Sequence, residues 1–141
     1  MLNLLLAEDN LPDALLVREA IQLERLPLDV HLVPDGDHAL RFLEKAEHDA
    51  EAPCPHVVVL DLNLPKVDGL TVLKRIRSSV KFRDIPVLVV SSSDAPADRK
   101  GAAELNARYF RKPPSYGEFL KIGAVLKAIL EGLSSGPESA P

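Results

Sequence analysis

The stretch Val57-Val58-Val59-Leu60-Asp61-Leu62-Asn63-Leu64-Pro65 sets four aliphatic residues directly before a carboxylate. An uninterrupted run of β-branched and aliphatic residues is typical of a strand that is buried on both faces of a parallel sheet. Open α/β sheets place their ligands beyond the carboxyl ends of such strands. Asp61 therefore occupies a position at which a sheet of this kind presents its chemistry.

A second apolar run, Leu4-Leu5-Leu6-Ala7, is followed by Glu8 and Asp9. If both runs are strands of one parallel sheet, three carboxyl groups meet at the same edge of that sheet. Carboxylates that lie close together repel one another, so a divalent cation or a shared proton is needed to hold them there. The sequence thus predicts an acidic site that is assembled from two strand ends.

The 141 residues suffice for one domain with an ordinary hydrophobic core. The 17 basic and 21 acidic residues give a net charge of −4, which offers no support for nucleic-acid binding. We expect no membrane span, because no apolar stretch approaches the ~20 residues that cross a bilayer. We expect no secretory leader, because the chain does not open with the charged and apolar regions of a signal peptide. The cytoplasm is therefore the expected location. Cys54 is the single cysteine and has no partner for a disulfide or a metal site.

Short apolar runs alternate along the chain with segments whose apolar residues recur about every 3.6 positions. This alternation predicts five units of strand then helix, and hence a parallel sheet with helices on both faces. The predicted strands are residues 4–7, 30–33, 57–60, 87–90 and 108–110. The predicted helices are residues 13–26, 37–47, 70–78, 97–105 and 116–133.

Several boundaries follow from local chemistry. Residues 1–133 are predicted to form the domain, whereas residues 134–141 have the composition of a linker and are expected to be a flexible tail. Ser93 or Asp94 is predicted to cap the helix that has Pro96 in its first turn. Asn106 lies between that helix and the fifth strand, where we expect a left-handed backbone conformation.

Five separate features, in order along the chain, resemble the receiver domain of two-component response regulators. They are the acidic pair Glu8-Asp9, Asp61 at the end of the third strand, Pro65 and Gly69 in the loop after it, Ser91 at the end of the fourth strand, and Lys112-Pro113 after the fifth. The resemblance covers about residues 3–130. It implies an α/β fold of the flavodoxin-like (βα)5 doubly wound type, whose five-stranded parallel sheet has the order 2-1-3-4-5.

The resemblance implies that Asp61 accepts a phosphoryl group from a phosphohistidine on a sensor histidine kinase. Phosphoryl transfer depends on neutralising charge more than on covalent help from the protein. Mg²⁺, or Mn²⁺, is implied as the cofactor, with Asp9, Asp61 and the Asn63 backbone carbonyl as ligands. Glu8 is implied to hold a metal-bound water. The protein would then catalyse only its own phosphorylation and dephosphorylation, and it is not an enzyme in the usual sense.

Further roles come with the resemblance. Lys112 and Ser91 are implied to bind the phosphoryl oxygens, the first as a point charge and the second through its hydroxyl. We expect a cis peptide bond between Lys112 and Pro113, which is rare among X–Pro bonds in general. Tyr109 is the implied switch residue, since movement of Ser91 toward the phosphoryl group leaves space for the aromatic ring to turn inward.

Two other positions, Asn63 and Ser93, flank the phosphorylation site where the family tunes water access and dephosphorylation. The output face is implied to comprise the fourth helix, the fifth strand and the fifth helix. Two residues depart from the commoner pattern. Ser91 stands where threonine is more frequent, and Pro114 follows Pro113 and stiffens the entry to the last helix.

Output by protein contact is expected, because no DNA-binding or enzymatic segment follows the receiver pattern in this sequence. The predicted helix over residues 116–133 carries an apolar arc wider than the roughly 100° stripe that packing on a sheet requires. The excess favours either a homodimer through the output face or a wide core face that neighbouring segments cover. The stretches 8–13, 61–69 and 105–109 resemble stand-alone regulators of the cyanobacterial-phytochrome response regulator type, which implies a phytochrome kinase as partner.

Other functions fit less well. A phosphorelay intermediate or phosphate sink, which exchanges phosphoryl groups with a histidine phosphotransfer protein, would use the same residues and stays open. A phosphatase with an aspartate nucleophile usually needs a second carboxylate two residues later, where this chain has Asn63, and it needs a cap domain. A flavodoxin-like cofactor binder would need a phosphate-cradling loop where Glu8 and Asp9 would repel a phosphate. A receiver that is not phosphorylated is the remaining alternative.

Overall fold

The computed structural model describes residues 1–135, and residues 136–141, most of the expected tail, lie outside that range. Strands and helices alternate from the amino terminus, as the hydrophobic pattern predicts. The elements in chain order are β1 (Leu2–Ala7), α1 (Leu11–Leu23), β2 (Leu28–Val33), α2 (Gly36–His48), β3 (Val57–Asp61), α3 (Gly69–Ser78), β4 (Val87–Ser91), α4 (Pro96–Glu104), β5 (Arg108–Arg111), α5 (Tyr116–Phe119) and α6 (Ile122–Ser135).

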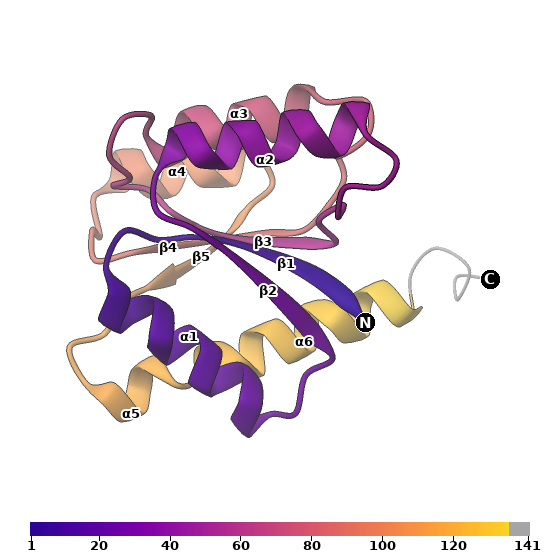
Figure 1. Cartoon of the computed structure of the whole chain (residues 1–141). Helices are drawn as coiled ribbons and strands as arrows, with labels where there is room; N and C mark the ends of the chain where they lie inside the picture. The colour runs from indigo at the N-terminus through magenta and orange to yellow at the C-terminus, as the bar shows by residue number, and fades with distance from the viewer. Residues whose placement is uncertain (136–141) are drawn as a thin grey trace.

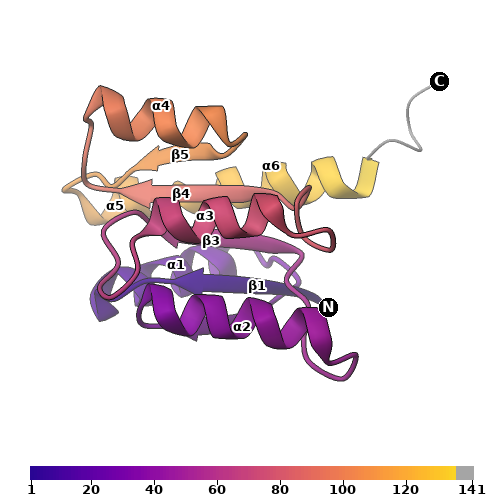
Figure 2. The ribbon, with the colours of Figure 1, turned by 90° about the horizontal axis from the view of Figure 1, so that it is seen from above.

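The five strands form one parallel sheet in the order β2-β1-β3-β4-β5, which confirms the predicted fold (Figure 1). Helices α1, α5 and α6 cover one face of the sheet, and α2, α3 and α4 cover the other. Seen from above, α4 lies beside the edge strand β5, while α2 lies toward the opposite side of the sheet (Figure 2). No helix within residues 1–135 combines the length and the apolar character that a membrane crossing needs.

Burial on both faces explains why the central strands read as continuous apolar runs. Every residue of β3 and β4 is buried, and alternate side chains point into two separate cores. Leu4, Val57 and Val59 belong to the core beneath α1 and α6, whereas Leu5 and Val58 belong to the core beneath α2 and α3. The strands are therefore held by packing on two sides, and their carboxyl ends are fixed at one edge.

Helix α1 begins two residues earlier than the sequence pattern predicts. Asn10 is its N-cap, and the side-chain oxygen of Asn10 accepts a hydrogen bond from the backbone N–H of Asp13 at 3.2 Å. Pro12 lies in the first turn, where its missing N–H costs nothing. The first turn of α1 is thereby fixed next to the end of β1.

The predicted cap of α4 is wrong, because Ala95 occupies the N-cap position and no side chain caps this helix. The Ser93 hydroxyl instead accepts a hydrogen bond from the N–H of Ala95 at 3.1 Å and donates one to Asp98 at 2.6 Å. Pro96 within the first turn restricts the residue before it to an extended conformation, which places Ala95 at the boundary.

The prediction of a left-handed backbone conformation at Asn106 is confirmed, since the φ of this residue is 56°.

The expected cis bond at Lys112-Pro113 is also corrected, because no peptide bond among residues 1–135 is cis. The trans form is intrinsically preferred for X–Pro bonds by about 0.5–1 kcal/mol. With this bond trans, the Lys112 ammonium reaches the carboxylates of the first and third strand ends, as described below.

The predicted final helix is divided in two, because the chain makes a turn at Leu120 and Lys121 between α5 and α6. Tight hydrogen bonds mark this turn, with the N–H of Gly123 donating to the carbonyl of Leu120 at 3.1 Å. The apolar periodicity runs through the interruption, so the pattern alone could not locate it. Helix α6 then continues to Ser135, into the first two residues of the predicted tail.

The wide apolar arc of this region is mostly covered within the chain. Leu130 is buried, and Leu120 and Val125 pack against the core that α1 and the sheet share. Leu133 is 41% exposed and is the main apolar residue that remains accessible. Of the two explanations for the arc, a wide core face therefore accounts for most of it.

The close approach of α1 and α6 generates a stability prediction. A Cβ at Gly123 would lie 2.9 Å from the carbonyl oxygen of Ala20, whereas a Cβ at Gly132 would meet nothing within 4 Å. We expect Gly123→Ala to lower the free energy of unfolding by roughly 1–3 kcal/mol, because the two helices must move apart. Gly132→Ala is expected to raise it by about 0.5–1 kcal/mol through helix propensity. Urea unfolding of both variants measures this, and a Gly123→Ala variant as stable as Gly132→Ala would contradict the close packing.

Candidate functional site

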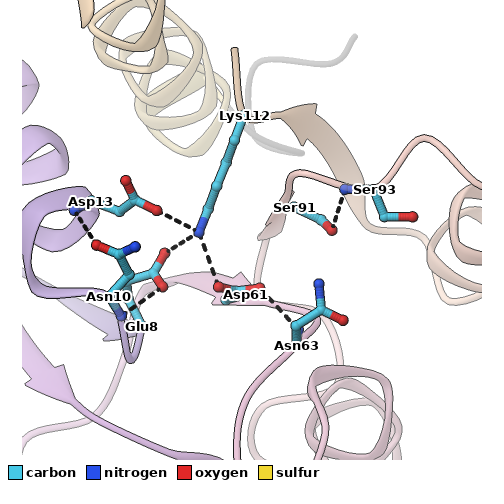
Figure 3. Close-up of polar contacts among 8 residues, drawn as sticks. All are labelled: Glu8, Asn10, Asp13, Asp61, Asn63, Ser91, Ser93 and Lys112. Carbon is cyan, nitrogen blue, oxygen red and sulfur yellow. Dashed lines mark hydrogen bonds and ion pairs between the residues drawn. The ribbon is translucent and has the colours of Figure 1, made fainter. Parts of the chain in front are cut away.

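The predicted acidic site is formed at the carboxyl edge of the sheet. Glu8 and Asp9 follow β1, and Asp61 is the last residue of β3, its immediate neighbour in the sheet. A carboxylate oxygen from each of the three lies within 4.8 Å of the others. Glu8 and Asp61 are each only 5% exposed, while Asp9 is exposed. Two buried acids and one accessible acid thus share one edge of the sheet, and Figure 3 shows the buried pair, Glu8 and Asp61.

The loop after β3 folds tightly against Asp61. The N–H of Gly69 donates to the carbonyl of Leu62 at 3.0 Å, and a Cβ at Gly69 would lie 2.3 Å from the backbone oxygen of Asp61. Any larger residue at position 69 would therefore push this loop away from the site. The N–H of Asn63 donates to Oδ1 of Asp61 at 2.9 Å, which fixes the orientation of that carboxylate. Its other oxygen, Oδ2, faces Lys112.

Lys112 supplies the positive charge of the site. It follows β5, and its backbone N–H donates to the carbonyl of Ser91 at 2.8 Å, so the fifth strand continues to pair with the fourth at this point. Its Nζ lies 2.8 Å from Oε1 of Glu8, 2.8 Å from Oδ2 of Asp13 and 3.0 Å from Oδ2 of Asp61. The side chain is 12% exposed. An ammonium has three N–H donors, and each of them faces a carboxylate.

The pKa values of Glu8 and Lys112 are both raised in this site. Burial and, next, the neighbouring Asp61 carboxyl raise the pKa of Glu8 to about 7, although Lys112 opposes this shift. Burial by itself lowers the pKa of the Lys112 ammonium, but the hydrogen bonds that it donates to Asp13 and Glu8 outweigh burial and hold the pKa above its ordinary value. Near neutral pH, and without a cation, the acids are thus held by a charged lysine and by a proton that Glu8 readily takes up.

The donors at the acidic edge suit a hard divalent cation. Glu8, Asp9 and Asp61 provide carboxylate oxygens and no sulfur or imidazole, which is the donor chemistry that Mg²⁺ and Mn²⁺ prefer. Exposed Asp9 leaves the cluster accessible from solvent. The residues present therefore fit the predicted cofactor. The carbonyl of Asn63, the other predicted ligand, lies two residues beyond Asp61 in the same loop.

Ser91 lies at the end of β4, between the strands that carry Asp61 and Lys112. Its side chain is fully buried, and its Oγ accepts a hydrogen bond from the N–H of Ser93 at 3.1 Å (Figure 3). The Ser91 oxygen is the acceptor in this bond, so the bond does not use the hydroxyl proton of Ser91. Ser91 is thus available to donate to an oxygen placed next to Asp61.

Tyr109 is joined to the same loop. Its hydroxyl donates to the backbone carbonyl of Ser93 at 2.7 Å, so the ring is directed toward the loop between β4 and α4. The guanidinium of Arg99, on α4, lies 4.5 Å from the centroid of the Tyr109 ring, within the range of a cation–π contact. Arg99 also pairs with Asp94 at 2.6 Å. The predicted switch residue therefore contacts both the loop that carries Ser93 and the fourth helix.

Two residues of this site were not predicted from the sequence. Asp13 contacts Lys112 across 99 positions of sequence, and Arg99 stacks on Tyr109 from a neighbouring element. An acid in the first turn of a helix is ordinarily explained by the helix dipole, and an exposed arginine needs no special explanation. The sequence contains one indication of a role for Asp13 in the site. Asp13 lies four residues after Asp9, in the helical turn that directly follows the acidic edge.

Comparison with known proteins agrees with the geometry. The sequence pattern of the response regulator receiver domain family matches residues 4–122. Response regulator Rcp1 from Synechocystis sp. is 32% identical over 120 residues, which are 84% of this chain and 82% of that protein.

Solved structures show the same fold. The phosphorylated cyanobacterial phytochrome response regulator RcpA superposes with a TM-score of 0.80 at 33% identity, covering 89% of this chain and 90% of that one. The Mn²⁺-bound form of response regulator Rcp1 superposes with a TM-score of 0.82 at 29% identity, covering 91% and 93%.

The raised pKa of Glu8 predicts how stability depends on pH in metal-free protein. The pKa of Glu8 rises from 4.5 to about 7 on folding. The folded protein therefore loses stability as the pH rises from the lower value to the higher one, because ionisation of Glu8 is less favourable in the folded state than in the unfolded state. Glu8→Gln cannot ionise, so between about pH 5 and pH 8 its stability is expected to improve relative to wild type by on the order of 2 kcal/mol. Urea unfolding in EDTA across this pH range measures the difference.

Glu104→Gln is the matched control, because Glu104 is an exposed acid near the end of α4. We expect its stability to follow that of wild type across the pH range. A Glu8→Gln variant whose curve also runs parallel to wild type would show that the Glu8 carboxyl titrates no differently in the folded and unfolded chain.

Proposed function

The chain belongs to the family of response regulator receiver domains, and on that premise we propose that it accepts a phosphoryl group on Asp61 from a sensor histidine kinase. One observation carries the proposal. Asp61 lies buried at the end of β3, with the Lys112 ammonium 3.0 Å from one of its oxygens and two further carboxylates at the same edge. This arrangement combines a carboxylate nucleophile with the positive charge that a transferring phosphoryl group requires.

In the proposed reaction, an oxygen of Asp61 attacks the phosphorus of a phosphohistidine on the kinase. A phosphorus–oxygen bond forms to the carboxylate, the phosphorus–nitrogen bond breaks, and its electron pair returns to the imidazole. Lys112 then faces a phosphoryl oxygen, and the buried Ser91 hydroxyl donates to another. Oδ1 of Asp61 accepts the hydrogen bond from the Asn63 N–H, and Oδ2 accepts the one from the Lys112 ammonium. Oδ2 is therefore the oxygen closer to the positive charge.

The proposed cofactor is Mg²⁺ or Mn²⁺, held by Asp9, Asp61 and the Asn63 carbonyl, with Glu8 placed to hold a water. When bound, the cation neutralises negative charge on the phosphoryl oxygens. Its support is the donor set of three carboxylates and the Mn²⁺ named for the related Rcp1 structure. A bound cation would also favour ionised Glu8, whose pKa is raised in the metal-free site.

Tyr109 is the proposed switch. A phosphoryl group on Asp61 would attract the Ser91 hydroxyl, whose oxygen accepts the bond from the N–H of Ser93. Because the Tyr109 hydroxyl donates to the carbonyl of the same Ser93, movement of this residue would be felt by the aromatic ring and by Arg99 stacked on it. Phosphorylation would in this way alter the face formed by α4, β5 and the final helices.

The proposed partner is a phytochrome histidine kinase. Its support is the phytochrome named for the related RcpA structure, together with the identity of 33% over 89% of this chain. We also propose that the protein acts in the cytoplasm. The proposed function requires neither a membrane nor a nucleic acid as a partner. The net charge of −4 is in keeping with a protein partner.

We further propose a homodimer through the face of α4, β5 and the final helices. Its support is that β5 is an edge strand, one side of which pairs with no other strand within residues 1–135. The support from the apolar arc is smaller than the sequence indicates, since most of the arc is covered within the chain.

Phosphorylation by a small-molecule donor tests the proposed function. Incubation with acetyl phosphate and Mg²⁺ is expected to add one phosphoryl group to the intact mass. The addition is expected to vanish in Asp61→Asn, which lacks the nucleophile, and in EDTA. Far-ultraviolet circular dichroism of the variant confirms that it is folded. A folded wild-type protein that gains no mass from this donor or from a phosphorylated phytochrome kinase would contradict the proposal.

Sedimentation equilibrium with and without beryllium fluoride, a phosphoryl analogue, tests the homodimer. We expect association to increase with the analogue and to be weakened by Arg108→Glu, which reverses an exposed charge on the edge strand β5. The matched control is Lys74→Glu, at an exposed position on α3. A monomer at every concentration in both conditions, or equal effects of the two variants, would exclude this interface.

A further inference from the structure

Lys112 has a third acidic partner that does not belong to a strand end. Oδ2 of Asp13 lies 2.8 Å from Nζ of Lys112, as close as Oε1 of Glu8 and closer than Oδ2 of Asp61 at 3.0 Å. Asp13 comes from the first turn of α1, so it approaches the ammonium from a different element (Figure 3). Its contact joins the first helix to the residue that follows the last strand.

The position of Asp13 is fixed by its own backbone. Its N–H donates to the side chain of the N-cap Asn10 at 3.2 Å, and the N–H of Ala14 donates to the Asn10 carbonyl at 3.0 Å. Glu8 in turn accepts from the N–H of Asn10 at 3.2 Å. The turn that carries Asp13 is thereby tied to the acidic edge, from which its carboxylate reaches Lys112.

The three partners of Lys112 differ in what else they do. Glu8 and Asp61 belong, with Asp9, to the group of carboxylates that lie within 4.8 Å of one another and fit a divalent cation. Asp13 is not a member of that group. A cation at the acidic edge would therefore compete with Lys112 for Glu8 and Asp61, but not for Asp13.

We propose that Asp13 is a positioning residue, which holds the Lys112 ammonium beside Asp61 while phosphoryl transfer takes place. The inference rests on the proposed function and adds a residue to it. Asp13 keeps one N–H of Lys112 throughout, and the N–H that faces Asp61 in the free site donates to a phosphoryl oxygen once that carboxylate is phosphorylated. The ammonium then needs no reorientation between the free and the phosphorylated site.

An ordinary structural role gives a different expectation. A carboxylate in the first turn of a helix interacts favourably with the helix dipole wherever the helix lies. Asp37 provides this comparison, because it lies in the first turn of α2 and pairs only with Arg41, at 2.7 Å, among the ion pairs found in residues 1–135. Asp37→Asn removes the same charge from the first turn of another helix, away from Lys112.

The first experiment compares rates of phosphorylation by acetyl phosphate and Mg²⁺, followed by intact mass. Asp13→Asn is expected to slow the reaction by about tenfold, since a displaced catalytic charge costs between a few-fold and a hundredfold. Asp37→Asn is expected to stay within about twofold of wild type. Asp13→Glu keeps the carboxylate and is expected to react faster than Asp13→Asn. A role in the helix dipole alone would slow Asp37→Asn as much as Asp13→Asn, because both variants remove an acid from a first helical turn.

The second experiment needs no cation and no phosphodonor. Thermal unfolding is measured in EDTA for wild type, Asp13→Asn, Lys112→Met and the double variant. If Asp13 acts through Lys112, the shifts in Tm are not additive, and Asp13→Asn has a smaller effect once Lys112 is absent. Additive shifts would overturn the contact itself.

The outcomes separate this inference from the proposed function. A wild-type protein that takes up phosphoryl groups, with Asp13→Asn as fast as wild type, overturns the positioning role and leaves the proposed function standing. A folded wild-type protein that takes up none overturns both. Slowing by Asp13→Asn, with recovery in Asp13→Glu and non-additive Tm shifts, establishes Asp13 as the positioning residue of Lys112.

Discussion

The site depends on one electrostatic constraint, which is the balance of several carboxylates at one edge of a sheet by a single ammonium. Glu8, Asp13 and Asp61 all lie within 3.0 Å of Nζ of Lys112, in surroundings that exclude most water. Charges in such surroundings interact strongly, so unpaired acids there would be costly. The ion cluster must form together with the fold, and it joins the first, third and fifth strand ends with the first helix.

The parallel sheet supplies the geometry that this balance requires. Strands β1, β3, β4 and β5 are adjacent in that order and run the same way, so the residues after each of them arrive at one edge. Packing on both faces fixes the strands, and the tight loop at Gly69 holds the chain against Asp61. The polar groups at the strand ends have few apolar contacts of their own. Their positions are set by the strands, which the close-packed hydrophobic layers hold rigid.

A second polar network connects the site to the surface. Ser91, Ser93, Tyr109 and Arg99 form a chain of contacts from the buried end of β4 to the outer side of α4. Each link is a single hydrogen bond or ring contact, and such links exchange partners at a modest cost in free energy. In the proposed switch, a change of charge at Asp61 would reach the fourth helix through these contacts, without repacking either hydrophobic core.

Local sequence patterns suffice to predict the fold class and the acidic edge, and the resemblance to receiver domains adds Lys112 beside that edge. Runs such as Val57-Val58-Val59-Leu60 can be satisfied only by burial on both faces, and the polar residues after them must then meet at one edge. The tertiary structure decided what local patterns do not encode. The turn that divides α5 from α6 interrupts no apolar periodicity, and Ala95 became the N-cap of α4 because Pro96 follows it. The contact of Asp13 with Lys112 joins α1 to the end of β5, and that of Arg99 with Tyr109 joins α4 to β5. The energy of such a pair depends on the distance between its groups, which is set only when the elements pack together.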